Sequence, residues 1–142
     1  MSESSSKTFV EQVMEYIENE NVAEIGDDLY MTSLPSSPDI AAAIRPTGGP
    51  EADVKLKYDS PTVQVTTRSD GDPRNGYELA KDIYDVLHGF AGVLIAGGYH
   101  VVSCYGIQSE PADIGRDENN RVRYSQNYQF EIERTSKHRN GA

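Results

Sequence analysis

The longest alternating run in the sequence, Tyr124–Thr135, constrains the fold more than any other feature. Bulky residues take every second position and polar residues stand between them, in the order Tyr124, Gln126, Tyr128, Phe130 and Ile132. A shorter run, Thr62–Arg68, places two valines on one side and Gln64 and Thr66 on the other. Because side chains of a β-strand point alternately to opposite faces, both runs predict strands with one face toward a core.

Two other segments have the apolar spacing of amphipathic helices, three and four residues apart. In residues 8–20 the apolar stripe lies opposite a row of glutamates, and a Thr-x-x-Glu capping box marks its start. The second stripe begins at Tyr77, so Asn75 is the expected cap of this helix. Gly89 or Gly92 is expected to end it, because glycine accepts the left-handed conformation.

The remaining segments complete an α+β pattern. We expect shorter strands at residues 29–34, 40–44 and 99–107, a turn at 69–76 and a loop at 108–120. The order of elements predicts a small mixed or antiparallel sheet of about four to five strands with two helices packed on one face. The length of 142 residues fits a single domain over residues 1–142, with a flexible tail at residues 136–142.

The net charge of −10 is unevenly distributed along the chain. Residues 1–59 carry 12 acidic and 4 basic residues, whereas residues 60–142 carry 11 and 9. So acidic a chain is not a nucleic-acid clamp, which needs an excess of Lys and Arg. Three explanations of the acidity stay open: ordinary solvated surface, a salty host cytoplasm, or head-to-tail assembly in which one subunit's acids face the next subunit's arginines.

Neither a membrane segment nor an export signal is evident. No apolar run approaches the roughly 18 residues that span a bilayer, and the N-terminus lacks the basic flank and apolar core of a signal peptide. We therefore expect no membrane insertion and no export. Cys104 is the only cysteine, so it forms no internal disulfide and builds no thiolate metal site alone.

No pattern in the sequence predicts an active site. Cys104 and His100 share a face of an expected strand but stand roughly 13 Å apart along it, too far for proton transfer. Residues 70–78 fail the calcium-loop pattern, because Arg74 and Asn75 occupy the positions of an oxygen ligand and a glycine. The glycine pairs Gly48–Gly49 and Gly97–Gly98 do not have the spacing of a phosphate-binding loop. We therefore expect no catalytic residue, no metal and no cofactor.

Two features favour an interaction protein over an enzyme. The sheet face opposite the helices is expected to be uncovered and to carry Gln64, Thr66 and Gln126. The chain has nine tyrosines, a residue type enriched at interfaces, and several lie on expected strands. The long loop at residues 108–123 also favours contacts, because long loops in small domains usually serve a function.

Several segments, taken in order, resemble phage minor capsid or tail terminator proteins. They are Pro61–Arg68, Gly76–Ala80, Gln108–Asp117, Arg121, Tyr124–Tyr128 and Arg134, after an N-terminal helix and a strand that ends in proline. The resemblance covers nearly the whole chain. It implies a structural virion protein without catalytic activity, a small α+β subunit that forms a hexameric ring on the tail tube. Such a ring halts polymerisation of the tube and presents a surface to the head-side connector.

The resemblance also implies positions for contacts with other subunits or partners. Residues that match motif positions are Arg68, Asp117, Arg121 and Asn127, and the candidate contact set adds Arg116, Arg123 and Arg134. The alternative role of these residues is internal, in salt bridges and loop hydrogen bonds within one subunit.

The partners implied are further copies of the chain in a homo-hexameric ring, the tail tube protein, and the head-side connector or stopper protein. DNA would pass through the lumen without specific binding. The implied location is the tail–neck junction of the virion, after assembly in the host cytoplasm. A head–tail connector or stopper protein is the nearest alternative function, and a monomeric adaptor and a soluble enzyme are the others.

Overall fold

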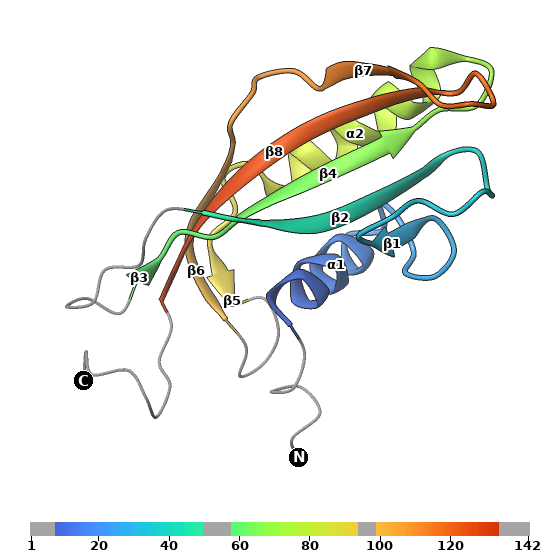
Figure 1. Ribbon diagram of the computed structural model, residues 1–142. Helices are drawn as coiled ribbons and strands as arrows, with labels where there is room; N and C mark the ends of the chain where they lie inside the picture. Colours follow the sequence, from blue (N-terminus) through green and yellow to red (C-terminus); the bar gives the residue numbers. More distant parts are fainter. Residues whose placement is uncertain (1–7, 50–57, 94–98, 134–142) are drawn as a thin grey trace.

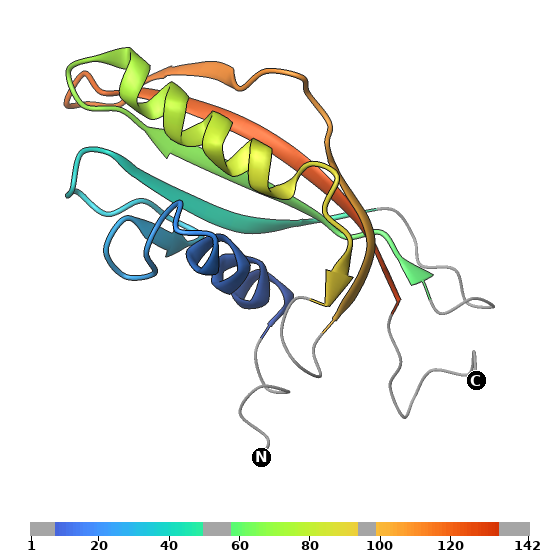
Figure 2. The ribbon, with the colours of Figure 1, turned by 180° about the vertical axis from the view of Figure 1, so that it is seen from behind.

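Two helices cover one face of a curved sheet, and no described helix covers the opposite face (Figure 1, Figure 2). This computed structural model describes residues 8–49, 58–93 and 99–133, so the expected flexible tail at 136–142 lies outside the described residues. The elements are α1 (Phe9–Asn19), β1 (Leu29–Met31), β2 (Ala41–Gly48), β3 (Tyr58–Asp59), β4 (Thr62–Arg68), α2 (Pro73–Leu87), β5 (Gly92–Val93), β6 (His100–Gly106), β7 (Ala112–Arg116) and β8 (Val122–Glu133). The expected α+β class with both helices on one face is confirmed.

The described sheet is mixed and centres on β4 and β8. Its strand order is β1-β2-β4-β8-β6-β5, and β3 and β7 pair with the two ends of β8. β1 and β2 run parallel, and the other described pairs are antiparallel. The sheet has more strands than the four or five expected, because β3 and β5 have two residues each, too few to leave an alternating pattern.

β8 joins the two halves of the sheet. It pairs with β4 along residues 123–129 and with β6 along residues 128–133. Tyr128, Phe130 and Ile132 are buried in the core on the helix side. The alternation of Tyr124–Thr135 therefore predicted the right strand and the right inward side chains for these three positions.

α1 begins at the expected capping box. The Thr8 Oγ1 accepts a hydrogen bond from the Glu11 amide at 3.2 Å, and the Glu11 Oε1 accepts one from the Thr8 amide at 2.9 Å. The apolar stripe of the helix is buried in the core. At its first turn Phe9 meets Phe130 of β8 edge to face, with 4.9 Å between ring centroids. The predicted helix at residues 8–20 is confirmed to within one residue at each end.

α2 begins four residues before the expected start at Tyr77. Asp72 is the cap, and its side chain accepts a hydrogen bond from an amide of the first turn at 3.1 Å. Asn75 lies inside the helix instead, where its Nδ2 donates to Asp70 at 2.9 Å. The expected cap is wrong because Pro73 is compatible with the first helical turn, where a missing N–H breaks no hydrogen bond.

Other boundaries also differ from the sequence-based expectation. β1 stops at Met31, because Thr32 adopts a positive φ of 78°. β2 continues past residue 44, through Pro46 to Gly48, with an irregular register between these two residues. α2 ends at Leu87, just before the glycine expected to end it.

β7 lies within the segment expected to be a loop. Residues 112–116 pair with the start of β8. Gly115 has a φ of 98°, and the register shifts between Asp113 and Arg116. Because this irregularity interrupts the alternation, the strand leaves no period-two pattern in the sequence. The loop prediction is therefore wrong for these residues.

Gly76 lies where α2 meets the end of β4. A Cβ at this position would lie 2.8 Å from the Ser69 backbone nitrogen, and the Gly76 carbonyl accepts from the Thr67 Oγ1 at 3.0 Å. We expect Gly76→Ala to lower the free energy of unfolding by about 1–3 kcal/mol, because overpacking exceeds the gain in helix propensity of about 1 kcal/mol.

Denaturant unfolding of purified variants measures this effect. Gly71→Ala is the control, because no atom lies within 4 Å of a Cβ added there. A Gly76→Ala protein as stable as the Gly71→Ala protein would contradict the prediction.

Candidate functional site

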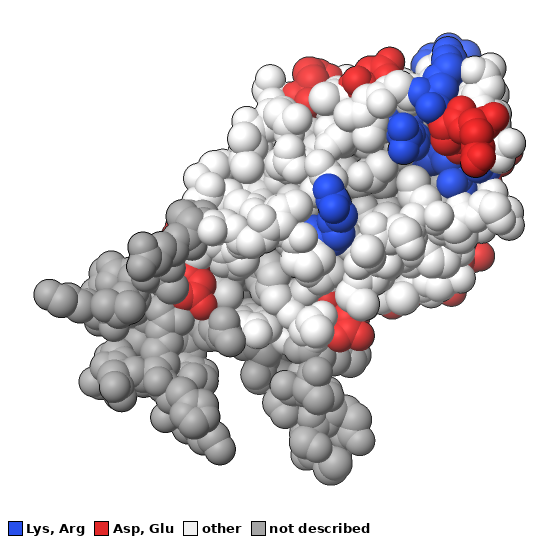
Figure 3. All heavy atoms as spheres, in the orientation of Figure 1, with Lys and Arg blue, Asp and Glu red and all other residues white. Residues whose placement is uncertain are grey.

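The face of the sheet opposite the two helices, which we call the open face, carries polar side chains from the central strands. In the observed register, Arg45 on β2 lies opposite Gln64 on β4, and Gln64 lies opposite Asn127 on β8. The Arg45 Nε donates a hydrogen bond to the Gln64 Oε1 at 2.9 Å. Figure 3 shows this face, with basic residues gathered beside acidic ones at one end. The prediction that Gln64 and Thr66 lie on this face is confirmed.

The expectation that Gln126 also lies on the open face is wrong. Gln126 stands opposite Val65 in the register, on the helix side, and is 1% exposed. Its Nε2 donates to the Gln108 carbonyl at 2.7 Å, so half of the amide is paired on that side. Gln126 is two residues from Tyr128, so its side chain points to the same, helix-facing side of β8. Its polarity had suggested the open face.

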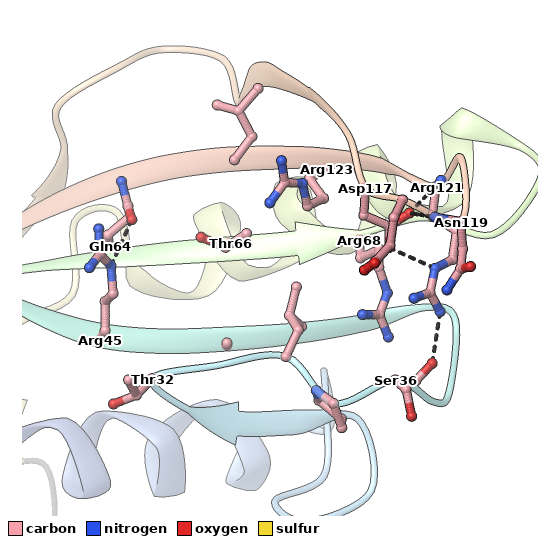
Figure 4. A pocket seen from close by; sticks show the side chains of 15 residues that line it. Thr32, Ser36, Arg45, Gln64, Thr66, Arg68, Asp117, Asn119, Arg121 and Arg123 are labelled. Carbon is pink, nitrogen blue, oxygen red and sulfur yellow. Dashed lines mark hydrogen bonds and ion pairs between the residues drawn. The ribbon is translucent and has the colours of Figure 1, made fainter.

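A groove of about 660 Å³ lies on the open face, at the end where β4 finishes and β8 begins (Figure 4). We call it the arginine groove. Strands β2 and β4 form its floor, the loop after β1 one wall, and β7 with the following turn the other. It is lined by Thr32, Leu34, Pro35, Ser36, Ala43, Arg45, Gln64, Thr66, Arg68, Ile114, Asp117, Glu118, Asn119, Arg121 and Arg123.

Arg68 ties the end of β4 to the loop before β2. Its Nε donates to the Asp39 carbonyl at 2.9 Å, and its Nη2 donates to the Pro38 carbonyl at 2.5 Å. The residue is 3% exposed. Burial, together with the nearby Arg121 guanidinium, lowers the pKa of Arg68. Arg68 is therefore a buried structural contact of the groove.

Arg121 and Asp117 hold the turn between β7 and β8. The Asp117 Oδ2 accepts from the Arg121 Nε at 2.9 Å, and its Oδ1 accepts from the amides of Arg121 and Asn119 at 2.9 Å and 3.0 Å. The Arg121 Nη1 also donates to the Ser36 carbonyl at 2.8 Å and to the Asp39 Oδ1 at 2.9 Å. An acid from the first half of the chain and an arginine from the second half thus pair within one subunit.

This turn makes stability depend on pH. Hydrogen bonds from the Arg121 amide, the Arg121 guanidinium and the Asn119 amide hold the pKa of Asp117 below its usual value. A pKa depressed by folding stabilises the fold above the unfolded value of about 4, and this contribution is lost as the pH falls through the folded value.

We expect Asp117→Asn to be less stable than the wild type at neutral pH and to approach it as the pH falls from about 4 through the lowered pKa of Asp117, where the wild-type carboxyl also becomes protonated. Denaturant midpoints of both proteins across this pH range test the expectation. A stability gap that stays constant with pH would contradict it.

Arg123 is a cation of the arginine groove without a described ion pair. It lies at the start of β8, opposite Arg68 in the register, and is half-buried. Its Nε is buried without a hydrogen-bond partner, and no ion pair between described residues involves its guanidinium. Arg68 and Arg121 are bound within the chain, and Arg45 donates to Gln64. Arg123 is therefore the groove arginine with no described side-chain hydrogen bond, and it is available to another molecule.

Comparison with known protein families decides the identity of the chain. A family model described as bacteriophage tail terminator protein matches residues 16–134. The chain belongs to this family. It is therefore a structural phage tail protein that interacts with other tail components, and the resemblance noted in the sequence is confirmed. No curated protein gives a significant match.

The segment matched by the tail terminator family contains every residue that lines the arginine groove. Four of the candidate contact residues meet there: Arg68, Asp117, Arg121 and Arg123. Arg116 is exposed at the end of β7, and its Nη1 donates to the Asn120 carbonyl at 3.1 Å. Asn127 lies farther along β8, and Arg134 lies outside the described residues.

Sequence reasoning missed the wall of the groove formed by the loop after β1. Ser36 and Asp39 in this loop are the partners of Arg121, 85 and 82 residues away in the chain. Arg45 was missed because β2 was expected to end at residue 44. Ile114, 44% exposed on the opposite wall, was missed because β7 was expected to be a loop. No short-range pattern marks these residues.

The structure gives Cys104 a structural role in this tail protein. The expectation that Cys104 and His100 share a strand face is wrong, because a β-bulge between Val101 and Ser103 shifts the alternation. Cys104 is buried in the core, whereas His100 is exposed and lies 3.3 Å from Glu133. Burial raises the pKa of the Cys104 thiol to about 12, so it stays protonated at neutral pH.

The remaining acidic side chains near α2 serve the helix start. Asp70 accepts hydrogen bonds from the Asp72 amide and from the Asn75 side chain, both at 2.9 Å.

Within the described residues, no group of three or more His, Cys, Asp or Glu side chains is placed to hold a metal ion. No helix of the described ranges has both the length and the apolar character needed to cross a membrane.

Proposed function

We propose that six copies of this chain form a ring that caps the phage tail tube, terminates its polymerisation and joins the tail to the head-side connector. The observation that carries this proposal is the match of residues 16–134 to the tail terminator family. In this proposal, residues 1–142 act as one domain at the tail–neck junction of the virion, after assembly in the host cytoplasm.

The open face of the sheet supports the proposal as a surface for subunit or partner contacts. A closed ring is built from heterologous contacts, so each subunit needs two different and complementary patches. The arginine groove supplies one patch, with Arg123 unpaired inside it. Exposed Arg116 lies beside the groove, and Asn127 extends the proposed contact surface along β8. Arg134, outside the described residues, is also proposed as a contact residue.

The charge of the chain supports passage of DNA through the lumen without specific binding. The net charge is −10, and acidic walls do not retain phosphates as basic walls would. The ring must also stop further growth, so one of its faces has to match a tube ring and the other has to reject a tube subunit.

Native mass spectrometry, with and without the tail tube protein, tests this function. We expect a closed oligomer of six chains that binds the end of the tube assembly. A strict monomer under both conditions would contradict the proposed ring. Cross-links only to portal-side proteins, with none to the tube, would instead indicate a connector or stopper.

A further inference from the structure

We infer that the arginine groove binds the acidic segment of the next copy in the ring, which we define as residues 18–28. This inference rests on the proposed ring and names the partner of its groove. The acidic segment carries five acids and neither Lys nor Arg: Glu18, Glu20, Glu24, Asp27 and Asp28. The groove is lined by four arginines and two acids.

The need for an outside anion comes from Arg123. Its guanidinium is half-buried in the groove lining, its Nε has no hydrogen-bond partner, and it makes no described ion pair, so a carboxylate from another copy would satisfy a charge that the subunit leaves uncompensated. The acids close to it are already bound, since Asp117 and Asp39 both accept hydrogen bonds from Arg121. Glu118 also lines the groove but is exposed, and no described ion pair joins it to Arg123.

The acidic segment presents exposed carboxylates on an ordered backbone. It connects α1 to β1, where the Asp28 Oδ1 accepts from the Glu24 amide at 2.7 Å and the Glu18 Oε2 accepts from the Ile25 amide at 3.0 Å. Glu20, Glu24 and Asp27 are exposed and available. The backbone of the turn is therefore already ordered, and little entropy is lost when it binds.

The acidic segment and the arginine groove also carry exposed apolar side chains that can pack together. Ile25 lies within the acidic segment and is 39% exposed, with Glu24 before it and Asp27 two residues after it. Ile114 on the wall of the groove is 44% exposed and shares the groove lining with Arg123. An Ile25–Ile114 contact with carboxylates on either side would bury both apolar side chains beside the ion pair.

The two patches lie on different parts of the subunit, as a ring requires. The acidic segment leads into β1, the edge strand of the described sheet, on the side of α1, whereas the groove lies on the open face (Figure 1). A contact between different patches is heterologous and can close into a ring. Duplex DNA is the alternative anionic occupant of the groove, and the experiments below distinguish it from the acidic segment.

Charge reversal tests the inference on the full chain. We expect Arg123→Glu to raise the subunit concentration needed for half assembly by about tenfold or more at about 0.1 M salt, because it places like charges in contact. The difference shrinks toward about 1 M salt, where the Debye length falls to about 3 Å. Arg74→Glu is the matched control, since Arg74 is exposed on α2 and its one ion pair among the described residues is with Asp72.

Reversal of the partner charge separates an ion pair from a general charge effect. We expect Glu24→Arg with Asp27→Arg to weaken assembly alone, and to restore it when combined with Arg123→Glu in one chain. Glu78→Arg, on the exposed side of α2, is the control for the acid side. Sedimentation velocity and native mass spectrometry give the assembly state, and circular dichroism checks that each variant is folded.

Two results would overturn the inference. They are a folded Arg123→Glu protein that assembles like the wild type and a combined variant that shows no rescue. If the Arg123→Glu protein assembles normally but loses binding to a duplex oligonucleotide, the groove binds nucleic acid instead. In each of these cases the wild-type ring survives, so the proposed function stands. A wild type that never assembles would instead contradict the ring itself.

Discussion

Phe130→Ala is expected to lower the free energy of unfolding by about 3–5 kcal/mol, the usual cost of truncating a buried aromatic residue. Phe130 is fully buried, lies opposite Cys104 of β6, and packs edge to face on Phe9 of α1. Its removal would leave a cavity where the first helix, β6 and β8 meet. A small domain has a total stability of about 5–15 kcal/mol, so this variant would be close to unfolding.

Equilibrium denaturation of Phe130→Ala and of Tyr105→Ala measures the effect against a control. Tyr105 lies on β6, one residue after Cys104, but is 41% exposed on the other face. We expect its truncation to cost less than about 1 kcal/mol, because little buried area is lost. Equal losses in the two variants would show that the core is not centred on β8.

Arg68→Ala is expected to lower the free energy of unfolding by about 3 kcal/mol. The change removes a charged donor from two carbonyls, those of Asp39 and Pro38, and a hydrogen bond to a charged group contributes about 1.5–3 kcal/mol. The loss of this contact also releases the loop that supplies Ser36 and Asp39 to Arg121.

The same denaturation experiment with Arg74→Ala controls for the loss of an arginine. The Arg74 side chain is 83% exposed and its ion pair with Asp72 is on the surface, so we expect a change within about 0.5 kcal/mol. An Arg68→Ala protein as stable as the Arg74→Ala protein would contradict the structural role of Arg68.

Local sequence patterns were sufficient to predict those elements whose structure depends on residues close together in the chain. The capping box of Thr8 and Glu11 marked the start of α1, and alternation located β4 and β8. The patterns failed where a backbone irregularity intervened. Gly115 and the register shift concealed β7, and the bulge after Val101 reversed the face expected for Cys104 relative to His100.

The candidate site was predicted as a set of residues but not as an arrangement. The resemblance to the family singled out Arg68 and Asp117, but only the register between β4 and β8 places Arg68 opposite Arg123. The Asp39–Arg121 pair joins residues 82 positions apart. Arginine is rarely fully buried, so nothing in the sequence indicated that Arg68 would be enclosed while Arg123 stayed unpaired.

The structure shows which acidic and basic residues of the unevenly charged chain pair with each other and which do not. Asp39 and Arg121 show that part of the acid–arginine complementarity is satisfied inside one subunit. Arg123 and the acidic segment at residues 18–28 are left for contacts between subunits under our proposal. Assembly should therefore respond to reversal of Arg123 more than to reversal of Arg121.

Growth of tail tubes in the presence of the purified chain tests the central claim most directly. Tube protein polymerised in vitro would be followed by electron microscopy before and after addition of the chain. The proposed function predicts a ring at one end of each tube and no further lengthening from that end when more tube protein is added. Tubes that keep growing from both ends, with no density added at either, would contradict it.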